Sequence, residues 1–182
     1  MIDVEIFDIV KEERSNVCLV LLTDRGERVL PIFIGAAEGM AIAAGIRKTQ
    51  FPRPMTYDLV CNILLAAGIV VHSVDISELR QSTYYSTIRI KSGDSEKAVD
   101  SRPSDAMAFA VRMGAQIRAA EEVMNEAAVK APEIARSAQG MVAMLRLVHV
   151  KLKQAASNEG WTVPELVNDA GEAKVRSLLA DS

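Results

Sequence analysis

The stretch "VDSRPSDAMAFAVRMG", residues 99–114, joins the end of a predicted strand to an alanine-rich helical pattern. Pro103 holds φ at about −65° and keeps the residue before it out of the helical region, so the chain turns sharply into a helix there. Small side chains along that helix allow a close approach to a neighbouring sheet. We therefore expect a strand, a tight junction and a helix at about residues 104–113.

A second stretch, "FPRPMTYDLVCNILLAAG" at residues 51–68, repeats this design. In both stretches an Arg-Pro pair precedes a hydroxyl residue, Thr56 or Ser104, and then an aspartate, Asp58 or Asp105. Hydroxyl side chains are favourable N-caps, and the positive end of the helix dipole stabilises carboxylates. Thr56 and Ser104 are therefore the predicted N-caps of the two helices.

The residues before these junctions predict a three-stranded meander. Residues 2–6 alternate apolar and acidic side chains, residues 16–23 form a continuous apolar run, and residues 28–35 follow a turn. Pro31 has no amide proton to donate to a neighbouring strand. The third strand is therefore expected at a sheet edge or with a bulge.

The remaining elements form strands with helices grouped between them. The patterns predict further helices at about residues 36–48, 56–67 and 121–129, and strands at 69–79, 83–91, 97–101 and 116–120. This order favours an α+β fold, with a mixed, mainly antiparallel sheet and packed helices, over a regular βαβ repeat.

The 182-residue chain is predicted to hold one domain, residues 1–128, and a helical C-terminal extension, residues 129–182. Apolar residues make up 49% and charged residues 25%, as in folded globular chains. Cys18 and Cys61 lie in apolar runs and are expected to be buried free thiols. Because the N-terminus lacks a basic leader and no apolar run has bilayer-spanning length, we expect a cytoplasmic location and no membrane partner.

The charge balance limits how this chain could bind nucleic acid. The formal net charge is −3, and residues 1–128 carry 14 Lys and Arg against 18 Asp and Glu. Affinity for polyanions depends on basic side chains that neutralise phosphates. A nucleic-acid site therefore needs a local basic patch, or metal ions that offset the acidic groups.

The arginines of the two junctions allow two interpretations. Arg53 and Arg102 stand at predicted helix N-termini, where a cation is unfavourable unless a carboxylate or a bound anion lies nearby. In the first interpretation, each arginine pairs with a neighbouring aspartate and holds the turn. In the second, arginine and helix N-terminus bind phosphate together, and nearby carboxylates serve as metal ligands or general base, namely Asp58, Asp100, Asp105 and Glu38.

Four stretches also resemble a known family. They read "VLPIFIGAAEGMAI", "RPMTYDLVCNIL", "STYYSTIRI" and "VDSRPSDAMAFAVRMGAQIRAAEEVM", and their order and spacing are similar to those of the bifunctional nuclease domain. The resemblance covers about residues 1–128. It implies a compact α+β fold, assembly as a homo-oligomer, and hydrolysis of phosphodiester bonds in DNA and RNA.

The resemblance also motivates a hypothesis for the roles of individual residues. The hypothesis assigns catalysis to Asp58, Asp105 and Glu38, substrate binding to Arg53, Arg102, Thr56 and Ser104, and metal binding to Asp100, Asp105 and Asp58. Clustered carboxylates without histidine favour hard cations, so Mg²⁺ or Mn²⁺ is the expected cofactor.

One residue departs from the family pattern. Tyr57 stands where the family usually has a histidine after Arg-Pro-x-Thr. With an ordinary pKa of about 10, tyrosine cannot act as a base or metal ligand as imidazole does near neutral pH. If the family histidine is catalytic, the departure weakens this chain; if it only forms hydrogen bonds within the fold, the Tyr57 hydroxyl can replace it.

A rival interpretation takes the chain as a non-catalytic oligomeric module. In it the Arg-Pro junctions are structural, and the helix at 36–48 and the tail form subunit contacts. Tyr84 and Tyr85 likewise allow two interpretations. They could form a base-stacking platform, or one could pack inside the fold while the other lies on the surface.

Overall fold

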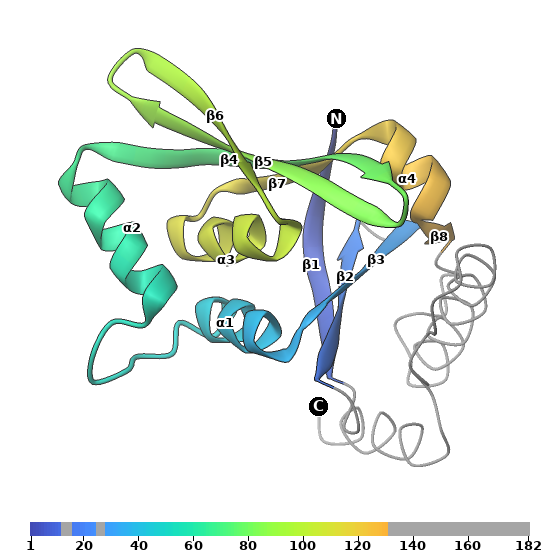
Figure 1. Cartoon of the computed structure of the whole chain (residues 1–182), viewed down its shortest axis with the longest axis horizontal. Coiled ribbons are helices and arrows are strands. Elements are labelled where there is room, and N and C mark those ends of the chain that lie inside the picture. Colours follow the sequence, from blue (N-terminus) through green and yellow to red (C-terminus); the bar gives the residue numbers. More distant parts are fainter. Residues whose placement is uncertain (12–15, 25–27, 131–182) are drawn as a thin grey trace.

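The computed structural model describes residues 1–11, 16–24 and 28–130. The helical extension was predicted for residues 129–182; its first two residues form a short strand instead, and the rest, from residue 131 onward, lies outside the described residues. The described part is an α+β domain with one mixed eight-stranded sheet and four helices, as the sequence predicts (Figure 1).

The sheet has the strand order β6-β5-β4-β7-β1-β2-β3-β8. Neighbouring strands are antiparallel except β4 and β7, which run parallel. The strands are β1 (Ile2–Lys11), β2 (Val17–Thr23), β3 (Arg28–Gly35), β4 (Ile69–Arg80), β5 (Thr83–Ser92), β6 (Ser95–Ser101), β7 (Gln116–Ala119) and β8 (Val129–Lys130). The short β8 was not predicted, because two residues are too few to show the alternation of apolar and polar side chains that indicates a strand.

The helices divide into a group of three and a single one. They are α1 (Ala36–Ile46), α2 (Thr56–Ala66), α3 (Pro103–Met113) and α4 (Glu121–Ala127). Figure 1 shows α1, α2 and α3 together on one side of the sheet, with α3 between the other two, and α4 near the opposite end. The helices that follow the two Arg-Pro junctions are therefore neighbours.

The core lies between the sheet and the group of three helices. The apolar run of β2 is buried from Cys18 to Thr23, which explains its lack of alternation. Large side chains that are fully buried fill this core, among them Leu22, Leu30, Ile32, Ile42, Ile76 and Met107.

The sheet curls so strongly that β5 approaches β3. The Tyr84 hydroxyl of β5 donates a hydrogen bond to the Pro31 carbonyl of β3 at 3.1 Å. In the described chain, β8 pairs with β3 only at Arg28 and Val29, so β3 is an edge at Pro31, as predicted. Tyr84 packs inside while Tyr85 is 38% exposed, which confirms the interpretation with one inner and one outer tyrosine.

The predicted N-caps are wrong by one and two residues. Met55 is the N-cap of α2 and Arg102 is the N-cap of α3. Pro103 takes the first helical position, so the extended residue before it becomes the cap and Ser104 falls inside the first turn. The helix α3 ends at Gly114, whose φ of 66° is in the left-handed region.

Both cysteines are buried free thiols, as predicted. Burial raises the pKa of Cys18 and of Cys61 above the ordinary thiol value. None of the described helices combines the length and the hydropathy that a membrane crossing requires.

Gly39 allows α1 to lie directly against β2. A Cβ atom at this position would come within 2.6 Å of the Cys18 sulfur. We therefore expect Gly39→Ala to lower the free energy of unfolding by about 1–3 kcal/mol, although alanine is the better helix former. Urea titration monitored by circular dichroism measures this, with exposed Met40→Ala as the control in the same helix. A stabilised Gly39→Ala protein would contradict the packing described.

Candidate functional site

The two Arg-Pro junctions meet in space. Tyr57 lies in the first turn of α2 and its hydroxyl donates a hydrogen bond to Asp105 Oδ1 of α3 at 2.6 Å. The Tyr57 ring packs edge-on against Phe109, with 5.4 Å between the ring centroids. The sequence could not show this contact, because the two residues are far apart along the chain.

Arg102 joins this pair to a third element. Its Nε and Nη2 atoms donate to the two carboxylate oxygens of Asp105 at 2.7 and 3.1 Å. Its Nη1 atom donates to Glu38 Oε1, in the first turn of α1, at 3.2 Å. We call Glu38, Tyr57, Arg102 and Asp105 the Arg102 cluster. For Arg102, the predicted pairing with a neighbouring aspartate is confirmed.

The fold brings the Arg102 cluster together from three helix N-termini. Glu38 follows the end of β3, Arg102 follows the end of β6, and Tyr57 begins α2. The Arg102 side chain is 66% exposed, whereas those of Glu38 and Asp105 are 23% and 26% exposed. The cluster therefore presents a guanidinium to solvent above two recessed carboxylates.

The hydrogen bonds of the cluster determine its protonation. Burial raises the pKa of Asp105, but hydrogen bonds from Arg102 and Tyr57 outweigh it, so the pKa lies below the ordinary aspartate value. Burial and the hydrogen bond to Asp105 raise the pKa of Tyr57 to about 12. At neutral pH, Tyr57 is thus a hydrogen-bond donor and Asp105 an anion.

Tyr57→Phe is expected to destabilise the protein by about 1 kcal/mol, because Asp105 loses one donor while the ring contact with Phe109 remains. The loss should shrink as the pH falls below the ordinary aspartate pKa of about 4 and through the lowered pKa of Asp105, where the folded carboxylate becomes protonated. Urea titration at several pH values measures both effects. Tyr85→Phe on the surface is the control. An equal loss at every pH would contradict the role of this hydrogen bond.

Asp58 belongs to a different arrangement. Its Oδ1 atom accepts a hydrogen bond from Arg112 Nε of α3 at 2.6 Å, and its Oδ2 atom accepts one from the Met55 backbone N–H at 3.0 Å. The hydrogen bond from Arg112 keeps the pKa of Asp58 below its ordinary value. Pairing of Arg53 with its neighbouring aspartate is therefore wrong, because Arg112 takes that aspartate.

Arg112 was missed by the sequence analysis. Its side chain is 8% exposed and its Nη1 atom also donates to the carbonyls of Ala41 and Ala108 at 3.0 and 3.1 Å. Its guanidinium lies 5.4 Å from the Tyr57 ring centroid. An arginine in the last turn of a helix carries no signal of such a role, since its partners come from α1 and α2.

Three predicted site residues lie apart from the Arg102 cluster. Arg53 and Thr56 are exposed, before and at the start of α2. Asp100 pairs across β5 and β6 with Thr87, whereas its neighbour Ser101 pairs with buried Ser86. Since successive residues of a strand face opposite sides, Asp100 points away from the core side that holds α3.

The three predicted metal ligands therefore do not form one group. Asp58 is held by Arg112, Asp105 by Arg102, and Asp100 faces the other side of the sheet. Within residues 1–11, 16–24 and 28–130, no three His, Cys, Asp or Glu side chains are placed to hold a metal ion. The carboxylates that share a cation at the cluster are Glu38 and Asp105, and that cation is Arg102.

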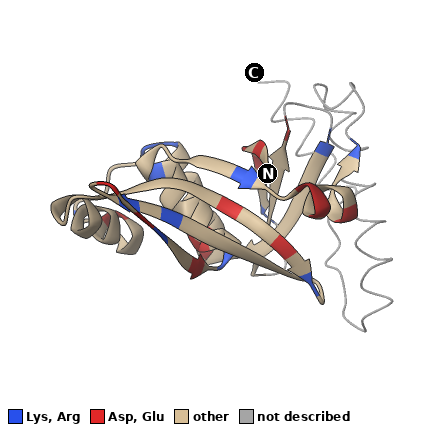
Figure 2. Ribbon diagram, turned by 90° about the horizontal axis from the view of Figure 1, so that it is seen from above, with Lys and Arg blue, Asp and Glu red and all other residues tan. Residues whose placement is uncertain are grey.

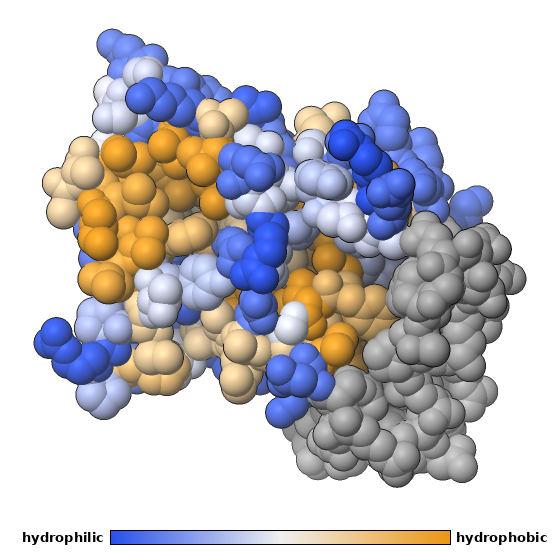
Figure 3. Space-filling model, viewed as in Figure 1, coloured by the Kyte–Doolittle hydropathy of each residue, from blue (hydrophilic) through white to orange (hydrophobic). Residues whose placement is uncertain are grey.

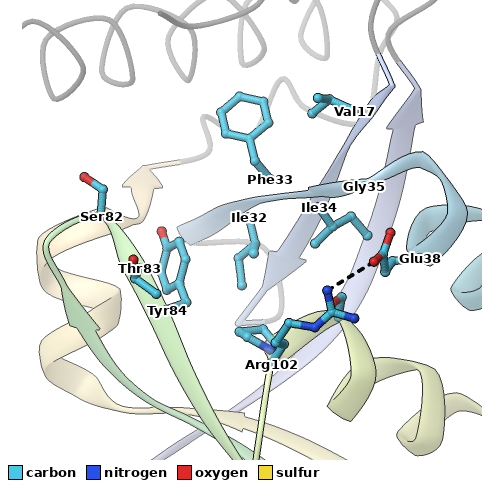
Figure 4. A pocket seen from close by; sticks show the side chains of 12 residues that line it. Val17, Ile32, Phe33, Ile34, Gly35, Glu38, Ser82, Thr83, Tyr84 and Arg102 are labelled. Carbon is cyan, nitrogen blue, oxygen red and sulfur yellow. Dashed lines mark hydrogen bonds and ion pairs between the residues drawn. The ribbon is translucent and has the colours of Figure 1, made fainter. Parts of the chain in front are cut away.

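A hollow of about 420 Å³ opens beside the Arg102 cluster. Figure 4 shows β3 crossing it, with Tyr84 on one side and Arg102 and Glu38 on the other. Its lining comes from β3, from the start of β5 and from the first turn of α3, and it includes Ile32, Phe33, Ile34, Thr83 and Ser104. The predicted substrate-binding residues Arg102 and Ser104 thus both border a cavity.

The lining of this hollow is not broadly basic, because it contains acidic Glu38 beside basic Arg102. In the view of Figure 2, Lys and Arg are interspersed with Asp and Glu across the strands. Several arginines of the sheet are paired, as Arg89 and Arg118 are with Asp75 at 2.6 and 2.7 Å. Any phosphate contact at the hollow must therefore depend on Arg102 itself rather than on a wide positive field.

Comparison with known proteins identifies relatives over most of the described part. Residues 19–132 match the bifunctional nuclease domain. Two uncharacterized proteins from strains of Mycobacterium tuberculosis are each 34% identical over 124 residues, which is 68% of this chain and 74% of theirs.

Two rice proteins are more distant. Bifunctional nuclease 1 of Oryza sativa is 31% identical over 94 residues, and Bifunctional nuclease 2 of Oryza sativa is 29% identical over 133 residues. These matches cover 50% and 71% of this chain but only 28% and 41% of the rice proteins.

Proposed function

Because the chain belongs to the bifunctional nuclease domain family, we propose that it hydrolyses phosphodiester bonds of DNA and RNA at the Arg102 cluster. The proposal locates the reaction where the two Arg-Pro junctions and the hollow meet. The names of the rice proteins support the class of reaction, and the geometry of the cluster supports its place.

The observation that carries the proposal is the unused edge of the Arg102 guanidinium. A guanidinium has five N–H donors. In the described structure, Arg102 uses Nε–H, one N–H of Nη2 and one N–H of Nη1 for Asp105 and Glu38. One N–H on each terminal nitrogen remains for a ligand. These two N–H groups can each donate to a non-bridging oxygen of a phosphodiester.

The cluster can perform the two tasks that such hydrolysis needs. A water molecule attacks phosphorus, negative charge grows on the non-bridging oxygens, and one P–O bond to the sugar breaks. The sugar oxygen leaves with the bonding electrons and takes a proton from solvent. Arg102 would stabilise the charge on the non-bridging oxygens, and Asp105 would hold the guanidinium in place. Glu38 lies beside Arg102 and would accept the proton of the attacking water. Tyr57 positions Asp105 through its hydroxyl.

Dependence of cleavage on a divalent metal ion stays a separate prediction. The expected set of Asp58, Asp100 and Asp105 does not fit a shared ion, for the reasons given above. We therefore derive no step through Mg²⁺ or Mn²⁺. Dependence on these ions is tested by the same cleavage assay in EDTA.

Cleavage of labelled single-stranded and double-stranded DNA and RNA tests the proposed function. Highly purified protein is assayed with Mg²⁺, with Mn²⁺ and with EDTA, beside Asp105→Asn purified identically. Asp105→Asn keeps the shape of the side chain but removes the charge that holds Arg102. We expect cutting by the wild type that Asp105→Asn lacks. Equal traces of cutting in both samples would contradict the proposal and identify a contaminant.

A second candidate function is that of an oligomeric module, and an exposed apolar face favours it. Leu59 and Ile63 of α2 are 51% and 57% exposed, although they lie four residues apart, a spacing typical of the buried face of a helix. Figure 3 shows an apolar patch on the side of the molecule where α2 lies. Exposed patches of this kind mark contact surfaces.

Leu59→Gln combined with Ile63→Gln is expected to reduce a homo-oligomer to monomers, because the contact loses its apolar side chains. Light scattering over a range of concentrations measures the mass. Met40→Gln tests the predicted contact of α1 instead, and Phe7→Gln on β1 is the control, since both residues are exposed. A wild-type protein that is monomeric at every concentration would exclude this assembly.

A further inference from the structure

The hollow beside Arg102 suits one nucleotide that has left a base-paired stack. We infer that the substrate of the proposed nuclease is single-stranded nucleic acid, of which one unpaired base enters this hollow while its phosphate binds Arg102. The inference rests on the proposed function and adds the class of substrate. Three features of the hollow carry it, namely its charge, its walls and the edge of β3.

The charge of the hollow is concentrated at one end. Arg102 is the basic residue among its lining residues, and its side chain is 66% exposed. The acidic residue of the lining, Glu38, lies at the same end and accepts a hydrogen bond from Arg102. The other end is formed by Thr83 and Tyr84 at the start of β5. A ligand with a single anionic group and an uncharged remainder therefore matches this arrangement, and a nucleotide unit of a chain has that form.

The walls of the hollow are mostly apolar. Ile32, Ile34 and Pro103 line it together with the Tyr84 ring, and Phe33 borders it from β3 with its ring on the other face of the strand. In Figure 4 the Tyr84 ring and the side chains of Ile32 and Ile34 lie around the space that faces Arg102. Cavities of about 300 Å³ or more with apolar walls and few polar groups hold small organic groups. The volume of about 420 Å³ is sufficient for a base with its sugar.

The free edge of β3 supplies polar groups that can read a base. The Pro31 carbonyl accepts the Tyr84 hydroxyl, so it points away from β2. Residues two apart on a strand direct their backbone groups to the same side, so the N–H and C=O of Phe33 also point away from β2. In the described chain, β8 does not reach Phe33, and these two groups have no strand partner. The edge of a base also carries a hydrogen-bond donor next to an acceptor, so it can pair with the N–H and C=O of Phe33.

A double helix does not fit this geometry without distortion. Its bases are stacked and paired, so insertion of one base requires unstacking that costs a few kcal/mol. A single strand has unpaired bases that enter without this cost. Arg102, the basic residue of the lining, also gives little of the backbone affinity on which duplex binding depends.

Binding of short labelled strands, measured by fluorescence anisotropy, tests the inference separately from catalysis. Thr83→Trp and Ile34→Trp fill the hollow from opposite walls without changing Arg102, and Thr87→Trp on β5 outside the hollow is the control. We expect the wild type and Thr87→Trp to prefer a single strand over a duplex of the same sequence by about tenfold. We expect the two filling variants to lose this preference, and a single strand with an abasic site to bind the wild type no better than the duplex does.

Three outcomes separate this inference from the proposed function. Equal binding of single strand and duplex by the wild type, with cleavage of both, would overturn the inference and leave the proposed nuclease activity in place. A preference for single strands that only the filling variants lose, without any cleavage, would support the hollow as a binding site and overturn the proposed activity. If the filling variants fold and still prefer single strands over duplex, the inference is overturned and the proposed nuclease activity is not affected.

Discussion

Arg102→Ala is expected to lower the rate of phosphodiester cleavage by a factor of about a hundred or more, because the transition state loses two N–H donors. The fold should survive, since the Arg102 side chain is 66% exposed and an exposed ion pair contributes less than about 1 kcal/mol to stability. A gel assay of cleavage at saturating substrate measures the rate. The unfolding midpoint of each variant shows whether the fold is intact.

Two further variants test what Arg102 contributes. Arg102→Lys tests whether the planar guanidinium is needed, and Arg80→Ala is a control at another exposed arginine. Lysine keeps the positive charge but has no planar pair of donors for two phosphate oxygens, so we expect most of the loss to remain. Arg80 is an exposed arginine paired with Glu78, and Arg80→Ala is expected to cleave like the wild type. Full activity in Arg102→Lys would show that charge alone is needed. Full activity in Arg102→Ala would show that Arg102 takes no part in cleavage.

Asp58→Ala is expected to lower the free energy of unfolding by about 2–3 kcal/mol, because it leaves the Arg112 guanidinium without its carboxylate and the Met55 N–H without its acceptor. This effect distinguishes a structural Asp58 from the catalytic Asp58 of the sequence hypothesis. Urea titration measures the stability, with Asp94→Ala in the exposed turn after β5 as the control.

The pH dependence of this effect has a definite direction. The hydrogen bond from Arg112 lowers the pKa of Asp58 in the folded state. The stabilisation is therefore complete above the ordinary aspartate pKa of about 4, and it is lost as the pH falls through the lowered value. The difference between wild type and Asp58→Ala should shrink in acid. A cleavage rate that falls far more than the folded fraction would instead support a catalytic Asp58.

The architecture was predictable because most elements carry a clear period. The strand-to-helix turns at the Arg-Pro pairs, the buried run of β2 and the edge position of Pro31 all follow from local chemistry. What the pattern of α2 could not show is which face is buried. Leu59 and Ile63 have the spacing of core residues, yet Cys61 is the residue of α2 that the domain buries.

The candidate site was predictable only in part, because its pairings are tertiary. The neighbouring positions of Arg102 and Asp105 made their ion pair an open alternative, and the structure contains it. Asp58 pairs with Arg112 and Tyr57 with Asp105, and both partners belong to α3. The sequence near Asp58 and Tyr57 therefore does not predict these contacts. Asp100 was misplaced because its side of the sheet depends on the register between β5 and β6.

The departure at Tyr57 has a physical interpretation. Its hydroxyl donates to Asp105, and its pKa of about 12 excludes a role as a base near neutral pH. The hydrogen-bonding alternative therefore agrees with the geometry of this chain. If this alternative is right, the change from the family histidine leaves the position of Arg102 intact.

The most direct test of the account is the cleavage rate of a labelled single strand by wild type and by the double variant Glu38→Gln with Arg102→Lys. Glu38→Gln keeps the size of the side chain, and Arg102→Lys keeps its positive charge. The account predicts that the wild type cuts the strand and that the identically purified double variant cuts it at least about a hundred times more slowly with an unchanged unfolding midpoint. Equal rates in the two samples would contradict the Arg102 cluster as the nuclease site.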